Sequence, residues 1–140
     1  MIRRALLDTG PLVAFLNAAD DHHAWAREAL AGVEPPMATC ESVLSEACFL
    51  LRRSGAGTAA VVELVARGLL VVPYRLEPDA ESVRRLLVKY ADVPMALADA
   101  CLVRMAEVDA QASVVTLDRD FLRYRRNGRH VLRVIAPFSA

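Results

Sequence analysis

Two aspartates directly follow short apolar runs, where a carboxylate is well placed for chemistry. Asp8 comes after residues 5–7, and Asp118 comes after residues 114–117. Strands buried on both faces of a parallel sheet appear in sequence as continuous apolar runs, and ligands bind beyond the carboxyl ends of such strands. Both aspartates are therefore expected beside such a crevice. Each also suits the N-cap of a following helix, because its side chain accepts hydrogen bonds from the first backbone N–H groups.

Two further acids, Asp99 and Glu46, are expected on helices beside apolar neighbours. The residues one turn before and after Asp99 are all apolar: Met95, Ala96, Leu102 and Val103. A favourable charge near a helix N-terminus contributes only about 0.3–1 kcal/mol, which is less than the cost of burying an unpaired carboxylate. We therefore expect Asp99 to have a functional partner. Glu46 has Phe49 and Leu50 one turn after it, which predicts a position on or beside an apolar face with a desolvation cost.

These four acids suggest one chemistry if the fold brings them to the same crevice. Four carboxylates cannot all ionise side by side unless a cation lies between them. Mg²⁺ and Mn²⁺ take oxygen ligands and bind substrate phosphates at the same time. Such ions activate water and stabilise the leaving oxygen of a phosphodiester. The acids therefore favour metal-dependent phosphodiester hydrolysis.

Apolar runs alternate with helical patterns along the chain, which predicts an α/β fold. Strands are expected at residues 5–7, 36–39, 69–72, 113–117 and 131–135. Helices are expected at residues 11–18, 22–30, 41–53, 58–67, 77–90, 96–108 and 118–124. Strands and helices that alternate at this spacing form a mainly parallel sheet with helices on both faces.

The composition is that of one folded domain. The chain has 140 residues, and its 17 basic side chains balance 17 acidic ones, so total charge predicts no partner. The cysteines, Cys40, Cys48 and Cys101, are odd in number and are expected to be reduced and buried. Asp8 interrupts the first apolar stretch before it reaches signal-peptide length, and no run approaches the ~18 residues that span a membrane. We expect a cytoplasmic protein with no membrane association.

Four short motifs together resemble those of PIN-domain ribonucleases. They are Asp8-Thr9, Glu46, residues 97–100 (Leu-Ala-Asp-Ala) and residues 116–121 (Thr-Leu-Asp-Arg-Asp-Phe). The resemblance covers nearly the whole chain in the right order. It implies a three-layer α/β/α sandwich with a mainly parallel sheet of four to five short strands, and a single nuclease domain over residues 1–140. A chain of this size is most similar to the VapC-type toxins of toxin–antitoxin pairs.

The resemblance implies a Mg²⁺- or Mn²⁺-dependent endoribonuclease that cuts RNA. The implied catalytic and metal-binding acids are Asp8, Glu46, Asp99 and Asp118. Thr116 is implied to orient Asp118 or a metal-bound water, and Asp120 is an alternative last acid. The family likeness also implies a homodimer and a cognate, VapB-like antitoxin whose terminal segment covers the acidic pocket. Gly10 departs from the family, which often has Ser or Asn there.

An arginine-rich stretch follows Asp118 and agrees with an RNA substrate. Residues 119–133 contain six arginines against one acid, Asp120. Cations beside an acidic pocket are what phosphate binding needs, so we expect RNA contacts from Arg119, Arg123, Arg125 and Arg126. A solvated basic surface helix is the alternative for this stretch. The alternative for the whole chain is a non-catalytic PIN-like module that binds RNA or protein.

Overall fold

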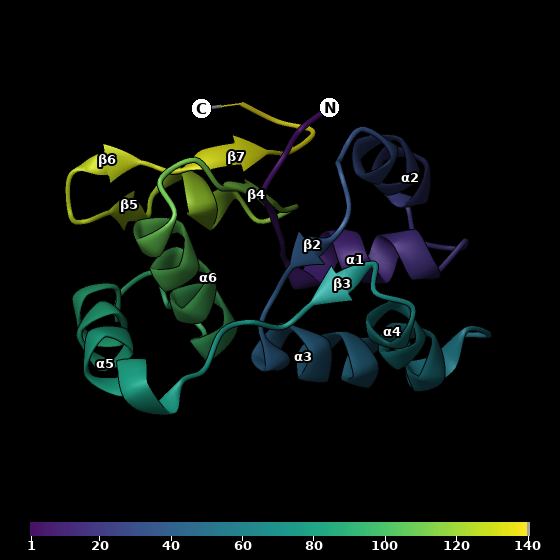
Figure 1. Cartoon of the computed structure of the whole chain (residues 1–140), viewed down its shortest axis with the longest axis horizontal. Coiled ribbons are helices and arrows are strands. Elements are labelled where there is room, and N and C mark those ends of the chain that lie inside the picture. The colour runs from purple at the N-terminus through teal and green to yellow at the C-terminus, as the bar shows by residue number, and fades with distance from the viewer. Residues whose placement is uncertain (140) are drawn as a thin grey trace.

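A parallel sheet forms the centre of the chain, of which the computed structural model describes residues 1–139 (Figure 1). Its five strands lie in the order β3-β2-β1-β4-β7, and every neighbouring pair is parallel. Leu6 at the centre of the sheet lies opposite Ala38 on one side and Val114 on the other. The strands are β1 (Ala5–Leu7), β2 (Met37–Ala38), β3 (Leu70–Val71), β4 (Ser113–Val115) and β7 (Arg133–Ile135).

Helices flank this sheet, which confirms the predicted α/β class. In Figure 1, α5 and α6 lie to the left of the view, and α1 to α4 lie to the right. Helix α6 packs against both β1 and β4, while α3 contacts α1, α4 and α6. The α-helices are α1 (Thr9–Leu16), α2 (His23–Ala31), α3 (Glu41–Leu51), α4 (Gly57–Ala66), α5 (Ala80–Lys89) and α6 (Leu97–Val108).

Burial explains why β1 and α6 form and where they lie. All three residues of β1 are buried, as expected for a strand covered on both faces. Seven of the twelve residues of α6 are buried, so this helix is fixed mainly by tertiary packing. Its first turn carries Asp99, and the packing on β1 and β4 brings that turn toward the sheet.

The C-terminal third differs from its sequence-based prediction. The expected helix at residues 118–124 is a short 3₁₀ turn, η2 (Arg119–Leu122), and the expected strand at 131–135 is two strands, β6 (His130–Val131) and β7. Strand β6 pairs antiparallel with β5 (Arg125–Arg126). Residues 127–129 join them, and Asn127 and Gly128 have φ angles of 53° and 72°, as a tight hairpin turn requires. The alternative of a basic surface helix is therefore wrong for residues 125–131.

Three other predictions need correction. The strands expected at 36–39 and 69–72 are each only two residues long, and the helix expected from residue 77 begins as a 3₁₀ turn, η1 (Glu77–Asp79). Cys40 and Cys101 are buried as free thiols, but Cys48 is only partly buried. Within residues 1–139, no helix combines the length and the apolar character needed to cross a membrane.

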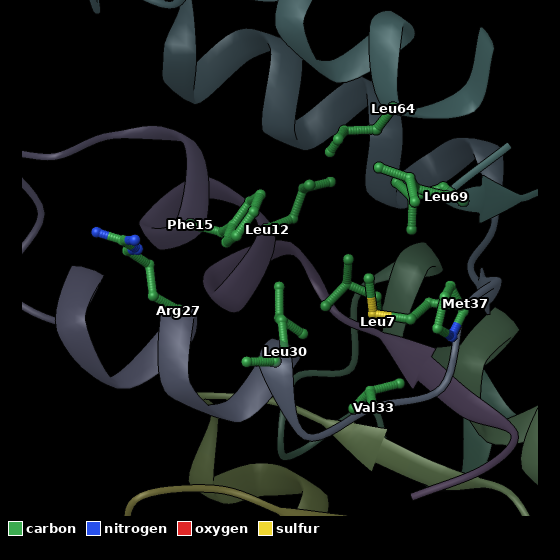
Figure 2. A pocket seen from close by; sticks show the side chains of 12 residues that line it. Leu7, Leu12, Phe15, Arg27, Leu30, Val33, Met37, Leu64 and Leu69 are labelled. Carbon is green, nitrogen blue, oxygen red and sulfur yellow. The ribbon is translucent and has the colours of Figure 1, made fainter. Parts of the chain in front are cut away.

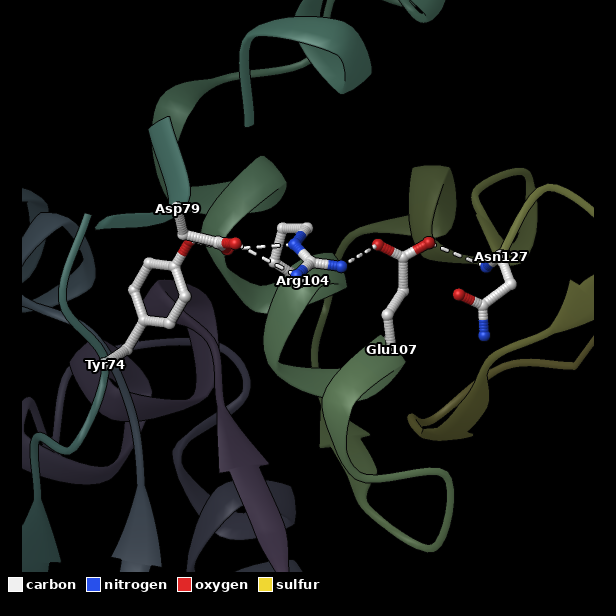
Figure 3. A network of polar contacts seen from close by, with 5 residues as sticks. All are labelled: Tyr74, Asp79, Arg104, Glu107 and Asn127. Atoms are coloured by element: carbon white, nitrogen blue, oxygen red, sulfur yellow. Dashed lines mark hydrogen bonds and ion pairs between the residues drawn. The ribbon is translucent and has the colours of Figure 1, made fainter. Parts of the chain in front are cut away.

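A polar network joins η1, α6 and the β5–β6 hairpin (Figure 3). Arg104 of α6 donates to both carboxylate oxygens of Asp79, at 2.8 and 2.9 Å, and to Glu107 Oε1 at 3.0 Å. The Tyr74 hydroxyl donates to Asp79 Oδ2 at 2.6 Å, and the Asn127 backbone N–H donates to Glu107 Oε2 at 2.6 Å. The Arg104 guanidinium holds the pKa of the Asp79 carboxyl below its usual range. The network therefore fixes the hairpin and η1 against the helix that carries Asp99.

Candidate active site

Asp8 stands at the carboxyl end of β1 and is also the N-cap of α1. Its Oδ1 accepts from the Thr9 backbone N–H at 2.8 Å, and its Oδ2 accepts from the Thr116 hydroxyl at 2.7 Å. The residue is only 6% exposed. The pKa of the Asp8 carboxyl is raised to about 6, mainly by burial and also by the charges of Asp99 and Asp118, while the hydrogen bonds from Thr116 and Thr9 act to lower it. The capping role and the position at the carboxyl end of the strand are therefore both present.

Thr116 connects Asp8 to the second strand-end acid. The register of β1 and β4 places Leu7 opposite Val115, so the residues that follow each strand are neighbours. The buried Thr116 hydroxyl donates to Asp8 and accepts from the Asp118 backbone N–H at 2.9 Å. Asp118 is the N-cap of η2, and its Oδ1 accepts from the Asp120 backbone N–H at 2.9 Å. Thr116 thus positions both Asp8 and the backbone of Asp118.

Asp99 enters from the first turn of α6. Its Oδ2 accepts from the Ala96 backbone N–H at 3.0 Å and from the Tyr124 hydroxyl at 3.3 Å. Burial raises the pKa of the Asp99 carboxyl, and the charges of Asp118 and Glu46 act in the same direction. Asp99 therefore lies near a helix N-terminus, where a negative charge is favourable. It also has other acids as neighbours, as expected for a functional site.

Glu46 corrects one expectation of the sequence analysis. It is exposed rather than desolvated, because its neighbours Phe49 and Leu50 are themselves 61% and 56% exposed. Its Oε2 accepts a hydrogen bond of 2.9 Å from the Thr9 hydroxyl, which ties α3 to the residue after Asp8. Glu46 therefore adjoins the other acids through Thr9, at the solvent side.

Asp118 and Asp120 differ in how they act on the other acids. The charge of Asp118 is among those that raise the pKa of both Asp8 and Asp99. The charges of Asp118 and Asp120 both raise the pKa of Tyr124, whose hydroxyl donates to Asp99. Asp120 lies instead 3.8 Å from the Arg123 guanidinium, as measured between Oδ1 and Nη1. These contacts favour Asp118 as the fourth acid.

The donor atoms of this cluster suit a hard divalent cation. Within residues 1–139, no three His, Cys, Asp or Glu side chains lie close enough together to hold a metal ion as they stand. The cluster nevertheless offers only carboxylate oxygens, which Mg²⁺ and Mn²⁺ prefer. A cation would also favour the ionised form of Asp8, which burial and its acidic neighbours disfavour. The residues therefore fit such an ion in ligand type and charge.

Comparison with known proteins identifies the family of this chain. The family model of the PIN domain matches residues 5–127, which is most of the chain. The chain belongs to the PIN domain family. Its fold is also similar to VapC20 of Mycobacterium tuberculosis, described as a sarcin-ricin loop cleaving toxin, with a TM-score of 0.73 at 22% identity. That match covers 83% of this chain and 91% of VapC20. A search of curated proteins found no match.

Two threonines and a tyrosine of this PIN domain hold its acids. Thr116 was predicted from its place in the motif, but the partners of Thr9 and the role of Tyr124 were not. Thr9 follows Asp8 in sequence, yet its hydroxyl partner Glu46 is 37 residues away. Tyr124 is 25 residues from Asp99. Only knowledge of which helices pack together could have identified these two contacts.

Gly10 has a packing role at this site. A Cβ added to Gly10 would lie 3.2 Å from the Leu117 Cβ. The first turn of α1 therefore packs tightly against the residue between Thr116 and Asp118. A serine or asparagine at this position would require the Leu117 side chain to shift by a few tenths of an ångström.

Replacing Thr116 by Val is expected to lower activity strongly and to change stability little. Valine keeps the buried volume but removes the donor to Asp8 and the acceptor for Asp118 N–H. Loss of such a supporting hydrogen bond typically reduces metal-site activity by about 10- to 100-fold. The pKa of Asp8 should also rise, because the Thr116 hydroxyl lowers it. Carboxyl ¹³C NMR of the metal-free protein measures that shift, and Thr116→Ser should restore most activity.

The four arginines expected to contact RNA differ in their surroundings. Arg125 Nη1 donates to the carbonyl oxygens of Leu122, Arg123 and Tyr124, at 2.7, 3.2 and 3.1 Å. That guanidinium therefore supports the end of η2. The Arg119 guanidinium lies over the Phe138 ring at 4.5 Å, and Arg123 is near Asp120. Arg126 lies in β5 of the hairpin and is partly buried.

An apolar cavity lies away from the acids. Its volume is about 350 Å³, and its lining comes from α1, α2, α4 and the neighbouring strands (Figure 2). Leu12, Phe15 and Leu30 point into it, and Arg27 stands at its edge. None of the four acids lines this cavity. The acidic cluster, not the cavity, is therefore the candidate active site.

Proposed function

We propose that this PIN domain, over residues 1–140, is a metal-dependent endoribonuclease that hydrolyses RNA phosphodiester bonds, and that it acts as the toxin of a toxin–antitoxin pair. The main support is the environment of Asp8. This carboxylate is buried, and its ionisation is opposed by burial and by Asp99 and Asp118. A bound cation would offset the burial of the Asp8 charge and its repulsion by Asp99 and Asp118.

The acids and their supporting threonines have distinct roles in this proposal. Asp8, Asp99, Asp118 and Glu46 would hold Mg²⁺ or Mn²⁺, and the ion would supply an activated water and stabilise the charge that develops on the phosphate. Thr116 orients Asp8 and the Asp118 backbone, and Thr9 orients Glu46. Arg119, Arg123 and Arg126 would neutralise neighbouring RNA phosphates.

The partners follow from the same proposal. RNA is the proposed substrate class, and VapC20, which has a similar fold, is described as a sarcin-ricin loop cleaving toxin. A cognate antitoxin of the VapB kind would cover the acidic cluster, and the exposed Phe49 and Leu50 beside Glu46 offer apolar area for such a contact. The chain would act as a homodimer in the cytoplasm.

The test is cleavage of structured RNA by the purified chain with controlled metal content. Cleavage is expected with Mg²⁺ or Mn²⁺ and is expected to stop in EDTA. Asp99→Asn should lower the rate by about 100-fold, because it removes one charged ligand. Glu63→Gln makes the same change of charge at an exposed site on α4 and should leave the rate unchanged.

The competing function is an RNA- or protein-binding module without catalysis. It gains some support because no three acidic side chains within residues 1–139 are assembled closely enough to hold a metal. Such a module would bind RNA with the same affinity in EDTA and in Mg²⁺. Binding of that kind, with cleavage indistinguishable between wild type and Asp99→Asn, would contradict the proposed nuclease.

A further inference from the structure

An aromatic cluster lies beside Asp99 and contains the buried Tyr124. The Tyr124 side chain is fully buried and meets the rings of Tyr90 and Phe121 edge to face, with centroids 5.0 and 5.2 Å apart. Its hydroxyl reaches Asp99 Oδ2 at 3.3 Å. A buried phenol of this kind has its ring held by packing and its oxygen held by one polar partner.

The same cluster fixes the segment that carries Asp118. Phe121 belongs to η2, for which Asp118 is the N-cap, so its buried ring anchors the turn directly after that acid. The Tyr90 hydroxyl accepts from the Arg125 backbone N–H at 2.9 Å, which anchors the chain directly after Tyr124. The cluster therefore joins the first turn of α6 to the loop after β4.

The hydrogen bonds to Asp99 are unevenly shared between its two oxygens. Both the Ala96 N–H and the Tyr124 hydroxyl donate to Oδ2. Within residues 1–139, Oδ1 accepts no hydrogen bond. Two donors on one oxygen restrict rotation of the carboxylate, and the other oxygen keeps its lone pairs for a ligand.

We propose that Tyr124 is a positioning residue of the acidic cluster, whose hydroxyl fixes Asp99 Oδ2 so that Oδ1 is presented to a divalent cation. This inference rests on the proposed function, since it assumes that Asp99 is a metal ligand. Tyr124 itself touches neither the ion nor the RNA. Its contribution is the orientation of one ligand oxygen before the ion arrives.

The test compares two hydroxyl deletions within the same aromatic cluster. Tyr124→Phe keeps the ring and removes only the donor to Asp99. Tyr90→Phe is the matched control, because its hydroxyl contacts the Arg125 backbone and not Asp99. The measurement is Mn²⁺ affinity of the metal-free protein by isothermal titration calorimetry, with the Mn²⁺-induced rise in Tm as a second readout. Tyr124→Phe should bind Mn²⁺ about 10-fold more weakly, and Tyr90→Phe should bind it as wild type does.

Cleavage kinetics give a further distinction. Tyr124→Phe should lower kcat and leave the KM for RNA unchanged, because the ligand geometry changes and the RNA surface does not. Wild-type Mn²⁺ affinity in Tyr124→Phe, or equal weakening in both variants, would overturn the positioning role.

Asp99→Asn separates the two proposals. Normal Mn²⁺ binding by that variant would overturn the metal site and this inference together, whereas weak binding there with normal binding in Tyr124→Phe would overturn this inference alone.

Discussion

Replacing Asp8 by Asn is expected to reduce RNA cleavage by about 1000-fold or more while making the metal-free protein more stable above neutral pH. The loss of activity follows because Asp8 is the most buried acid of the cluster and the central ligand of the proposed ion. Removing a central member of a catalytic set typically has an effect of at least this size. The gain in stability has a separate cause, because asparagine removes a charge that is buried in the folded protein.

The sign of the stability effect follows from the pKa of Asp8. Its folded-state pKa is about 6, which is above the unfolded value of about 3.9. The native state therefore holds its proton more tightly, and stability falls as pH rises from about 4 to about 6. The loss is complete above that range and amounts to about 3 kcal/mol. Asparagine does not ionise, so its folded state avoids this loss.

The measurement is chemical denaturation of wild type and Asp8→Asn in EDTA at pH 5 and pH 8. The stability of the variant should rise relative to wild type as pH rises. The net gain at pH 8 should be only about 1–2 kcal/mol, because asparagine has one acceptor oxygen and loses one of the two hydrogen bonds that Asp8 accepts from Thr9 and Thr116. Added Mn²⁺ should stabilise wild type and not the variant. A pH-independent difference between the two proteins would contradict the buried ionisation of Asp8, and equal cleavage would contradict its catalytic role.

Replacing Arg104 by Met should have the largest effect on stability, about 2–3 kcal/mol at pH 7. Methionine replaces the apolar stem of the arginine but removes both hydrogen bonds to Asp79 and the one to Glu107. Asp79 and Glu107 side chains are only 21% and 9% exposed, so their charges would lose a partner in a poorly solvated place. The effect is below that of a fully buried pair, because Arg104 is itself 21% exposed.

The pH dependence of this variant identifies the interaction. Arg104 depresses the pKa of Asp79, so the stabilisation is present above the unfolded pKa and is lost as pH falls through the folded one. The difference between wild type and variant should therefore shrink below about pH 4. Arg84→Met is the matched control. Arg84 makes a similar two-atom contact with Glu81 on the exposed surface of α5, and its loss should have little effect. Equal destabilisation by both variants would exclude a special role for the Arg104 network.

Much of the fold was predictable from local patterns in the sequence. Residues 5–7 and 113–117 have the continuous apolar character of strands buried on both faces, and β1 and β4 lie at those places. The acids at their carboxyl ends followed directly. Asp99 was identified because an acid among apolar helical neighbours is costly without a partner. These features depend on residues within a few positions of one another.

Two errors show where local patterns are insufficient. Glu46 has apolar neighbours on α3, but they face solvent, and periodicity alone does not tell which apolar face of a helix is covered. The β5–β6 hairpin was missed even though Asn127-Gly128 is a common hairpin turn, because its strands are only two residues long and mostly polar. Short polar strands form when other elements hold their ends, as Glu107 and Tyr90 do here.

The class of fold, the family and the acids at the strand ends could be predicted because strand burial, helix periodicity and motif order depend on residues near one another in the chain. The way in which those acids are held depends on contacts between distant segments. Thr116 reaches Asp8 across 108 residues of chain because β4 lies beside β1, and Tyr124 reaches Asp99 because β5, which follows Tyr124, packs against α6. Contacts of this kind depend on strand order and helix packing, which arise from burial of the whole core and not from any local segment.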